Sequence, residues 1–360
     1  MLKIATVFGT RPEIIKLSAL MRALDERAIH TTIHTGQHYS YNMDELFFVD
    51  LKLRKANYTL CVGSGTHAEQ TAKIMMGVEE ILLSERPDIV IVQGDTNSAL
   101  GGALAAVKLG IKVLHIEAGC RSFNKAMPEE INRILIDHCS SHLFVTDGIG
   151  EENLLREGIP GGIIHLIGST AMETARKNAE YTDGKTLERF GLRPDKYVLC
   201  TIHRSENTSG GQVLRDIVGA LNKIAEKIKV LLPLHPRTLS IVNSEKIEIS
   251  GLISVIEPLG YLEFLAVMKG SHFIMTDSGG VQEEAAALDV PCFVLRNETE
   301  WVNLMRMGKI SLVSNDGERI FREICKVLNE PAILEGMKRV SLPDANAVEL
   351  IMLGIESIKD

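Results

Sequence analysis

Basic, acidic and histidine side chains gather where the apolar runs of this chain end. Turns alone favour glycine, asparagine and aspartate, and they do not explain this supply of His and Arg. Such side chains can bind an anion, move protons and stabilise a leaving group, so we interpret the set as the lining of a ligand site. The segments are Gly9-Thr10-Arg11, Gly36-Gln37-His38, Gly94-Asp95-Thr96, Glu117-Ala118-Gly119, His203-Arg204, His235-Pro236-Arg237 and Asp277-Ser278-Gly279-Gly280.

Acidic residues in the first half follow apolar runs or lie in the adjoining loop: Asp95, Glu117 and Glu129, with Glu130 beside the last. Positioned carboxylates with tuned pKa values can remove a proton from carbon and return it. The alternative is that they cap helices or pair with Arg121 and Arg133. That alternative is strongest for Glu130 and weakest for Asp95 and Glu117, which follow apolar runs directly.

The stretch FGTRPEIIK, residues 8–16, places a glycine and a cation at the start of an expected helix. Thr10 and Glu13 have the spacing of a capping box, with Arg11 in the first turn. One interpretation is a well-capped helix alone. The other is an anion site, where Gly9 allows close approach while helix amides and Arg11 bind the charge. The residues leave both open.

The segment DSGGVQEE, residues 277–284, repeats this arrangement in the second half. Ser278 is placed to cap a helix, and Gly279 and Gly280 to expose its amides to a phosphate. One turn later, Glu283 or Glu284 can accept ribose hydroxyls. Two anion sites, one in each half, suggest a diphosphate held by two domains.

Composition and missing motifs exclude several classes of protein. The 360 residues carry a net charge of −8, which argues against a nucleic-acid or anionic-membrane surface. No apolar run approaches the roughly 20 residues of a membrane span, and the first residues lack a signal-peptide pattern, so we expect a cytoplasmic protein. GxGxxG, GxxxxGK[ST] and HExxH are absent. The six scattered cysteines lack metal-site spacing and are expected to be reduced packing residues.

The elements that must position these residues alternate between short apolar runs and helical patterns. Because the runs are almost uninterrupted, we expect parallel sheets covered by helices on both faces, and hence a doubly wound α/β fold. Strands are expected at 3–10, 30–37, 88–95, 111–119, 142–147, 163–169, 196–204, 229–236, 252–258, 272–280 and 290–296. Helices are expected at 11–24, 43–48, 67–86, 99–110, 128–140, 150–158 and 346–360.

The alternation is interrupted after residue 168 by a polar stretch without a strand. We therefore expect two doubly wound domains, at residues 1–168 and 169–343, the first carrying the candidate acid–base residues and the second the glycine-containing segment 277–284. The last helix, within residues 344–360, follows Pro343 and is expected to pack back on the first domain.

Eight motifs together resemble the non-hydrolysing UDP-N-acetylglucosamine 2-epimerases. They occur in order from residue 8 to residue 284: FGTRPEIIK, TGQH, QGDT, HIEAGCRS, PEEINR, TIHRSEN, LHPR and TDSGGVQEE. The resemblance implies a glycosyltransferase-B-type fold, with two Rossmann-like domains facing across a cleft that holds a UDP-sugar. It also implies a homodimer without a metal or other cofactor. The implied reaction interconverts UDP-GlcNAc and UDP-ManNAc through elimination of UDP to 2-acetamidoglucal and its re-addition.

The resemblance also implies roles for individual residues. Asp95, Glu117 and Glu129 would be acid–base groups, and His203 would assist the leaving phosphate. The expected contacts to the UDP-sugar come from Arg11, Lys16, Gln37, Arg204, His235, Ser278, Gly279, Gly280 and Glu284.

Three departures from the family pattern bear on the substrate and its regulation. Many members have TERPE where this chain has TEWVN at 299–303, and TEW is similar to epimerases acting on UDP-2,3-diacetamido-2,3-dideoxyglucuronate. Gly168-Ser169 replaces a usual Gly-Asn. Glu69-Gln70 replaces the Arg-Gln of members regulated by a second UDP-GlcNAc. The TEW sequence makes the diacetamidoglucuronate epimerase the first alternative. The others are a hydrolysing relative, a glycosyltransferase of the same fold and a non-catalytic nucleotide-sugar sensor.

Overall fold

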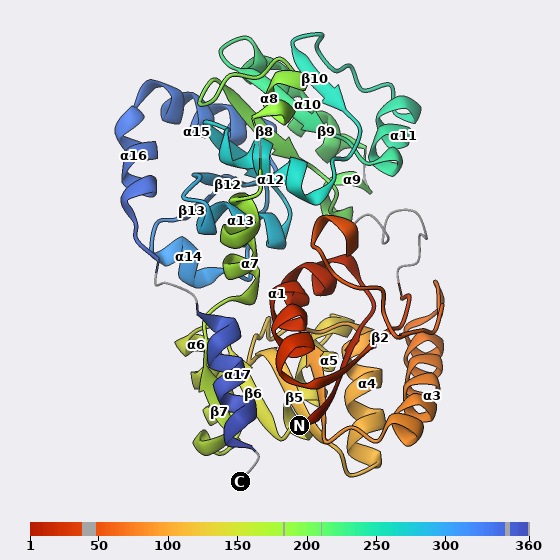
Figure 1. Cartoon of the computed structure of the whole chain (residues 1–360). Helices are drawn as coiled ribbons and strands as arrows, with labels where there is room; N and C mark the ends of the chain where they lie inside the picture. The colour runs from red at the N-terminus through yellow and green to blue at the C-terminus, as the bar shows by residue number, and fades with distance from the viewer. Residues whose placement is uncertain (38–47, 183, 210, 343–345, 359–360) are drawn as a thin grey trace. The chain divides into compact units, whose positions relative to one another are not determined.

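The computed structural model describes residues 1–37, 48–182, 184–209, 211–342 and 346–358 of the chain. They divide into two compact units (Figure 1), each built on one parallel sheet. Unit 1 comprises Met1–Thr174 with Asp344–Asp360, and unit 2 comprises Ala175–Pro343. The predicted α/β class with two parallel sheets is confirmed. In the part of the chain described, every helix is too short or too polar to cross a bilayer.

Unit 1 has the strand order β3-β2-β1-β4-β5-β6-β7, in which every pair is parallel. The order reverses between β1 and β4, and ligands of such sheets bind beyond the carboxyl ends of the strands at this switch point. The strands are β1 (Lys3–Phe8), β2 (Ile29–His34), β3 (Tyr58–Thr59), β4 (Ile89–Gln93), β5 (Lys112–Ala118), β6 (His142–Val145) and β7 (Ile164–Leu166). The helices are α1 (Arg11–Arg27), α3 (His67–Glu85), α4 (Asn97–Lys108), α5 (Pro128–Cys139), α6 (Gly148–Arg156), the 3₁₀ turn η1 (Gly161–Ile163) and α17 (Ala347–Ser357). Helix α7 (Thr170–Ala179) begins in unit 1 and ends in unit 2.

Unit 2 repeats this topology, with the parallel order β10-β9-β8-β11-β12-β13 and its switch point between β8 and β11. The strands are β8 (Tyr197–Thr201), β9 (Lys229–Pro233), β10 (Ile253–Ile256), β11 (Phe273–Thr276), β12 (Cys292–Val294) and β13 (Ile310–Leu312). The helices are α8 (Lys185–Arg189), α9 (Ser205–Thr208), α10 (Gln212–Ala225), α11 (Pro236–Ser244), α12 (Tyr261–Lys269), α13 (Gly279–Ala287), α14 (Val302–Arg306), α15 (Gly317–Asn329) and α16 (Pro331–Arg339).

The strands next to the switch points are buried along their length. All five residues of β4 and the last five of β1 are buried, as the uninterrupted apolar runs predict. In unit 2, one apolar cluster joins β8, β9 and β11 to α10 and α15. Rigid central strands therefore carry the loops that hold the candidate site residues.

The C-terminal helix α17 packs within unit 1. Gly354 lies against the ring of Phe144 on β6, so closely that an added Cβ would come within 2.8 Å of it. At the start of the helix, the amide of Val348 donates to the Glu173 carboxylate at 2.9 Å. A glycine and a buried acid thus fix α17 on this unit.

Two edge strands, β3 and β13, were not predicted from the sequence. They are short, with two and three residues. The helix predicted at 43–48 lies outside the described residues except for residue 48. His38 also lies outside them.

Candidate functional site

Glu117 occupies a bulge at the end of β5. Its neighbours Ile116 and Ala118 pair with consecutive residues of β6, so Glu117 is the extra residue, and its φ of 69° lies in the left-handed region. A non-glycine residue in this conformation is costly and must be held by its surroundings. The bulge turns the Glu117 carboxylate to partners on two other elements.

Those partners are Lys16 of α1 and Gln93 at the end of β4. The ammonium of Lys16 lies 2.6 and 2.8 Å from the two carboxylate oxygens of Glu117. Gln93 donates its side-chain amide to the same carboxylate. The Glu117 side chain is only 16% exposed, so a largely desolvated carboxylate is paired with one cation and one amide. The sequence-predicted residues Lys16 and Glu117 are thus in direct contact.

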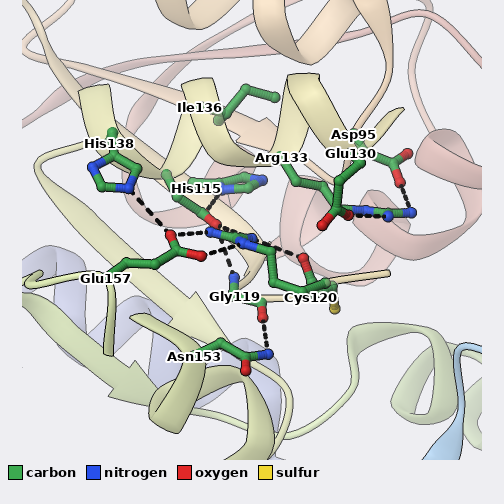
Figure 2. Close-up of polar contacts among 12 residues, drawn as sticks. Asp95, His115, Gly119, Cys120, Glu130, Arg133, Ile136, His138, Asn153 and Glu157 are labelled. Carbon is green, nitrogen blue, oxygen red and sulfur yellow. Dashed lines mark hydrogen bonds and ion pairs between the residues drawn. The ribbon is translucent and has the colours of Figure 1, made fainter. Parts of the chain in front are cut away.

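Asp95 lies in the loop after β4 and pairs with Arg133 of α5 at 2.5 Å (Figure 2). Asn132 donates to the backbone oxygen of Asp95 at 2.8 Å and to Asn97 at 3.2 Å. Arg133 also contacts the buried Glu130 at 3.0 Å. Both the backbone and the carboxylate of Asp95 are therefore held by α5.

Cys120 lies near the charged groups around Glu117 and around Asp95. Its thiol is influenced by the charges of Glu117, Lys16 and Arg133, and burial, the largest effect, raises its pKa far above the ordinary value. A thiol with a raised pKa is a poor nucleophile at neutral pH. This agrees with the interpretation of Cys120 as a packing residue, and all six cysteines are free thiols.

Glu130 has a structural task, as the alternative for it proposed. It accepts the amides of Ser122 and Phe123 at 2.9 Å each and pairs with Arg133. Burial acts against its charged form, but these hydrogen bonds and Arg133 outweigh it and lower the pKa of Glu130. Its neighbour Glu129 lies half-buried in the first turn of α5.

A buried charge network beneath this site was not predicted from the sequence (Figure 2). Asp137 accepts from His115 at 2.6 Å and from the amide of Gly119 at 3.1 Å, and it pairs with Arg121 at 2.7 Å. Arg121 also pairs with Glu157 at 2.7 Å. Of the acids that the structure describes, its partners are thus Asp137 and Glu157, and not the candidate acids Asp95, Glu117 or Glu129. Burial opposes the charge of Asp137, but His115 and Arg121 outweigh it and lower its pKa.

His115 joins this network to the loop before Asp95. Its other ring nitrogen faces the backbone oxygen of Gly94 at 2.8 Å, so both ring nitrogens lie within hydrogen-bond distance of an oxygen. Gly119 must be glycine, because its φ is 77° and an added Cβ would lie 2.4 Å from the oxygen of Gly150. The network therefore holds the loop after β4, through Gly94, and the loop after β5, through Gly119.

The capping box predicted at the start of α1 is confirmed. Glu13 accepts the amides of Gly9 and Thr10 at 3.0 and 2.8 Å. The structure gives Gly9 a packing role, because an added Cβ would lie 2.0 Å from Thr35 Oγ1 and 2.2 Å from Ser98 Oγ. Contact with the protein is thus sufficient reason for glycine at this position.

Gln37 supports the neighbouring helix start. Its side-chain oxygen accepts the amide and the hydroxyl of Ser98, in the first turn of α4, at 2.9 and 2.7 Å. Gln70 donates to its backbone oxygen at 3.3 Å. The structure thus places Gln37 as a buried link between α3 and α4.

In unit 2, a buried aspartate connects the two loops at the switch point. Asp277, directly after β11, accepts the amides of His203 and Arg204 at 3.0 Å and pairs with His203 Nδ1 at 2.9 Å. Asn207 donates to it at 3.0 Å. The His203 side chain is 50% exposed, so Asp277 holds one ring nitrogen while much of the ring faces solvent.

The start of α13 differs in detail from the expectation. Ser278 is the N-cap residue, but its hydroxyl makes no capping hydrogen bond. The open side of Gly279 is occupied, since an added Cβ would lie 2.2 Å from a Glu300 oxygen, and Trp301 donates to the Gly279 oxygen at 3.0 Å. Gly280 has open space at this position.

The other predicted residues of unit 2 are Arg204 at the N-cap of α9, Glu284 on α13 and His235 before α11. Glu300 pairs with Arg296 at 2.7 Å and with Arg204 at 3.5 Å. Glu284 lies buried on α13 and interacts with Tyr261, whose pKa is raised first by burial and then by this carboxylate. His235 is the N-cap of α11 and accepts from the amide two residues later.

Among the described residues, no group of three or more His, Cys, Asp and Glu side chains is arranged to hold a metal ion.

Comparison with known proteins identifies relatives along almost the whole chain. The profile of the UDP-N-acetylglucosamine 2-epimerase family matches residues 22–356. A UDP-N-acetylglucosamine 2-epimerase of Methanococcus maripaludis is 44% identical, over 91% of this chain and 92% of the relative. A UDP-2,3-diacetamido-2,3-dideoxy-D-glucuronate 2-epimerase of Pseudomonas aeruginosa is 42% identical, over 87% and 88%.

A solved structure is similar over its full length. The UDP-GlcNAc 2-epimerase of Methanocaldococcus jannaschii in complex with UDP-GlcNAc and UDP is 41% identical, covers 100% of both chains and has a TM-score of 0.88. With this neighbour, the predicted glycosyltransferase-B-type class of two Rossmann-like units is confirmed.

Proposed function

This chain belongs to the UDP-N-acetylglucosamine 2-epimerase family, and we propose that it interconverts UDP-GlcNAc and UDP-ManNAc. A carboxylate removes the C2 proton, the C–H electron pair forms a C1=C2 double bond, and the bond from C1 to the UDP oxygen breaks. UDP leaves with that electron pair, and 2-acetamidoglucal remains bound. Protonation of C2 on its other face and return of UDP to C1 complete the inversion.

The observation that carries this proposal is the environment of Glu117. A strained bulge, a cation and an amide hold its carboxylate in one place, and such strain is retained where the surroundings over-determine it. Lys16 and Gln93 compensate its charge, so it can act as a base without bulk water. We assign Glu117 and Asp95 as the principal acid–base groups, with Glu129 as a further candidate.

The remaining assignments concern the diphosphate and the nucleoside. With Nδ1 of His203 held by Asp277, its Nε2 is left to donate to the leaving phosphate. Arg11 supplies positive charge at the start of α1. The other proposed contacts are Lys16, Gln37, Arg204, His235, Ser278, Gly279, Gly280 and Glu284, the last to the ribose.

Product analysis tests this function. Incubation of the purified protein with UDP-GlcNAc, followed by proton NMR, is expected to give UDP-ManNAc in equilibrium with the substrate. Accumulation of UDP with free N-acetylmannosamine would instead indicate a hydrolysing enzyme. Binding of UDP-GlcNAc without conversion would contradict the proposal and favour a sensor.

A second candidate substrate is UDP-2,3-diacetamido-2,3-dideoxyglucuronate. The observation that favours it is Trp301, which replaces the arginine of TERPE and lies against Gly279 at the start of α13. The relative from Pseudomonas aeruginosa carries this activity in its name. The two substrates are compared by kcat/KM, and turnover of the diacetamido sugar alone would replace the leading assignment.

We also propose that the protein is a homodimer. Large apolar side chains are exposed on α3 and α5, where a second copy could cover them: Met76, Leu83, Ile131 and Leu135. Light scattering during size-exclusion chromatography measures the mass directly. A monomeric mass at micromolar concentration would refute the proposal.

A further inference from the structure

Glu13 is a buried carboxylate for which the proposed reaction has no role. Its side chain lies in the first turn of α1 and the residue is 1% exposed. One carboxylate oxygen accepts the Gly9 amide at 3.0 Å and the amide and hydroxyl of Thr10 at 2.8 Å each. The other accepts the hydroxyl of Thr96 at 2.8 Å. One side chain therefore binds two loops that are more than eighty residues apart in the sequence.

These two loops are the ones on either side of the unit 1 switch point. Thr10 follows β1 and precedes Arg11, while Thr96 follows β4 directly after Asp95. Thr96 is also the N-cap of α4, and its hydroxyl accepts the Ala99 amide at 3.0 Å. The orientation of the Thr96 hydroxyl is thus fixed by two hydrogen bonds: it accepts from the Ala99 amide and donates to the Glu13 carboxylate.

We propose that Glu13 is a positioning residue for epimerisation, which holds the loop of Asp95 in register with the loop of Arg11. This inference rests on the proposed function, since it assigns Asp95 a role at the sugar and Arg11 a role at the diphosphate. Glu13 acts through Thr96 and Thr10 and touches neither the substrate nor the reacting atoms. Small displacements of catalytic groups reduce rates strongly, so a tether between these loops has a large effect on kcat.

The protonation state of Glu13 changes this tether. Burial raises the pKa of Glu13 to about 7, against the opposing hydrogen bonds from Thr96, Gly9 and Thr10. The charged groups on the surrounding elements are Arg11 and Lys16 on α1, Asp95 after β4 and Glu117 on β5. The carboxylate accepts from all four donors. The protonated form carries a hydrogen on one of its oxygens, so at least one of these hydrogen bonds must weaken or reverse its direction. Only the ionised form accepts all four hydrogen bonds.

The first test compares two threonines that cap helices in the same way. Thr96→Val removes the hydroxyl that reaches Glu13, together with the N-cap of α4. Thr66→Val is the matched control, because Thr66 caps α3 by accepting the Glu69 amide at 3.2 Å, away from Glu13. We expect kcat of Thr96→Val to fall about tenfold or more, with KM changed less than about threefold. Thr96→Ser restores kcat, and Thr66→Val leaves it unchanged.

The second test uses Glu13→Gln, which keeps the size of the side chain and resembles the protonated acid. We expect its kcat at pH 8 to be about tenfold below wild type, and the fall of kcat below neutral pH to become shallower. Equal effects of Thr96→Val and Thr66→Val would overturn the inference. So would a wild-type pH profile in Glu13→Gln.

A measurement without turnover separates this inference from the proposed function. Carbon NMR of the Glu13 carboxyl follows its titration in the wild type and in Thr96→Val. Loss of the Thr96 donor is expected to move the midpoint to higher pH, and an unchanged midpoint would show that the tether is absent. If the midpoint moves while the wild type fails to epimerise UDP-GlcNAc, the tether stands and the proposed function fails.

Discussion

Glu117 shows at the scale of one residue how a carboxylate is prepared for proton transfer. A left-handed backbone at a bulge aims the side chain, and Lys16 and Gln93 hold it. In unit 2, Asp277 holds His203 in a comparable way, through one ring nitrogen, the amide of His203 and the amide of Arg204. In both units, a buried or half-buried polar partner fixes the candidate group.

Glu117→Gln is predicted to lower kcat by about 10²–10⁴ with KM little changed, because the amide keeps the shape but accepts no proton. Steady-state kinetics with UDP-GlcNAc measure both constants. Glu349→Gln is the control, since this exposed glutamate on α17 pairs with Arg27 at 3.3 Å. A kcat within a few-fold of wild type in Glu117→Gln would remove Glu117 from the acid–base assignment.

Glu13 is also predicted to make stability depend on pH. Its folded pKa of about 7 exceeds its ordinary 4.5, so the folded state binds the proton more tightly than the unfolded state. The free energy of unfolding therefore falls as pH rises from 4.5 to 7, by up to about 3 kcal/mol.

Urea unfolding followed by circular dichroism at several pH values checks this prediction. Glu13→Gln lacks the titration, so its free energy of unfolding should lose less between acidic and neutral pH than that of the wild type. Parallel pH dependences of the two proteins would contradict the assigned pKa.

Much of this residue-level account follows from position at strand ends. The sequence predicted Asp95 and Glu117 because parallel strands bring their carboxyl ends to one edge of a sheet, whereas Lys16 was predicted from the family resemblance. It did not predict that Asp137 binds Arg121 and His115. These contacts join β5 to α5 through side chains whose partners no local pattern specifies.

At the scale of elements, close packing around β5 fixes the loop that follows Glu117. Gly119 lies against Gly150 at the start of α6. The side-chain amide of Asn153 donates to the backbone oxygen of Gly119 at 3.0 Å (Figure 2). One interpretation of the sequence placed anion sites at Gly9 and Gly279. At both glycines, neighbouring side chains occupy the space that an added Cβ would need. Sequence alone marks a glycine as permissive, but only the three-dimensional neighbours say what approaches it.

Gly119→Ala is predicted to destabilise the protein by roughly 2–4 kcal/mol, since strain at positive φ adds to the clash with Gly150. Gly110→Ala is the matched control, with a φ of 73° and no atom within 4 Å of an added Cβ. Gly110→Ala introduces the backbone strain without a clash, so it should lower the free energy of unfolding by about 1 kcal/mol. Denaturant unfolding measures both, and equal losses would show that the loop relaxes away from Gly150.

At the scale of the whole molecule, the apolar runs and their rhythm predicted the two parallel sheets. Buried central strands leave a strong signal in the sequence, whereas the short edge strands β3 and β13 were not predicted. The motif set predicted the family, which the matching profile confirms over residues 22–356. The roles of the individual site residues, the homodimer and the cytoplasmic location stay predictions.

Exchange at C2 in heavy water tests the central claim most directly. The purified protein is incubated with UDP-GlcNAc in deuterium oxide, and the products are followed by NMR. We predict that deuterium enters C2 as UDP-ManNAc forms, and that Glu117→Gln slows exchange and inversion together. Formation of UDP-ManNAc with the C2 proton retained, or no exchange at all, would contradict the elimination mechanism.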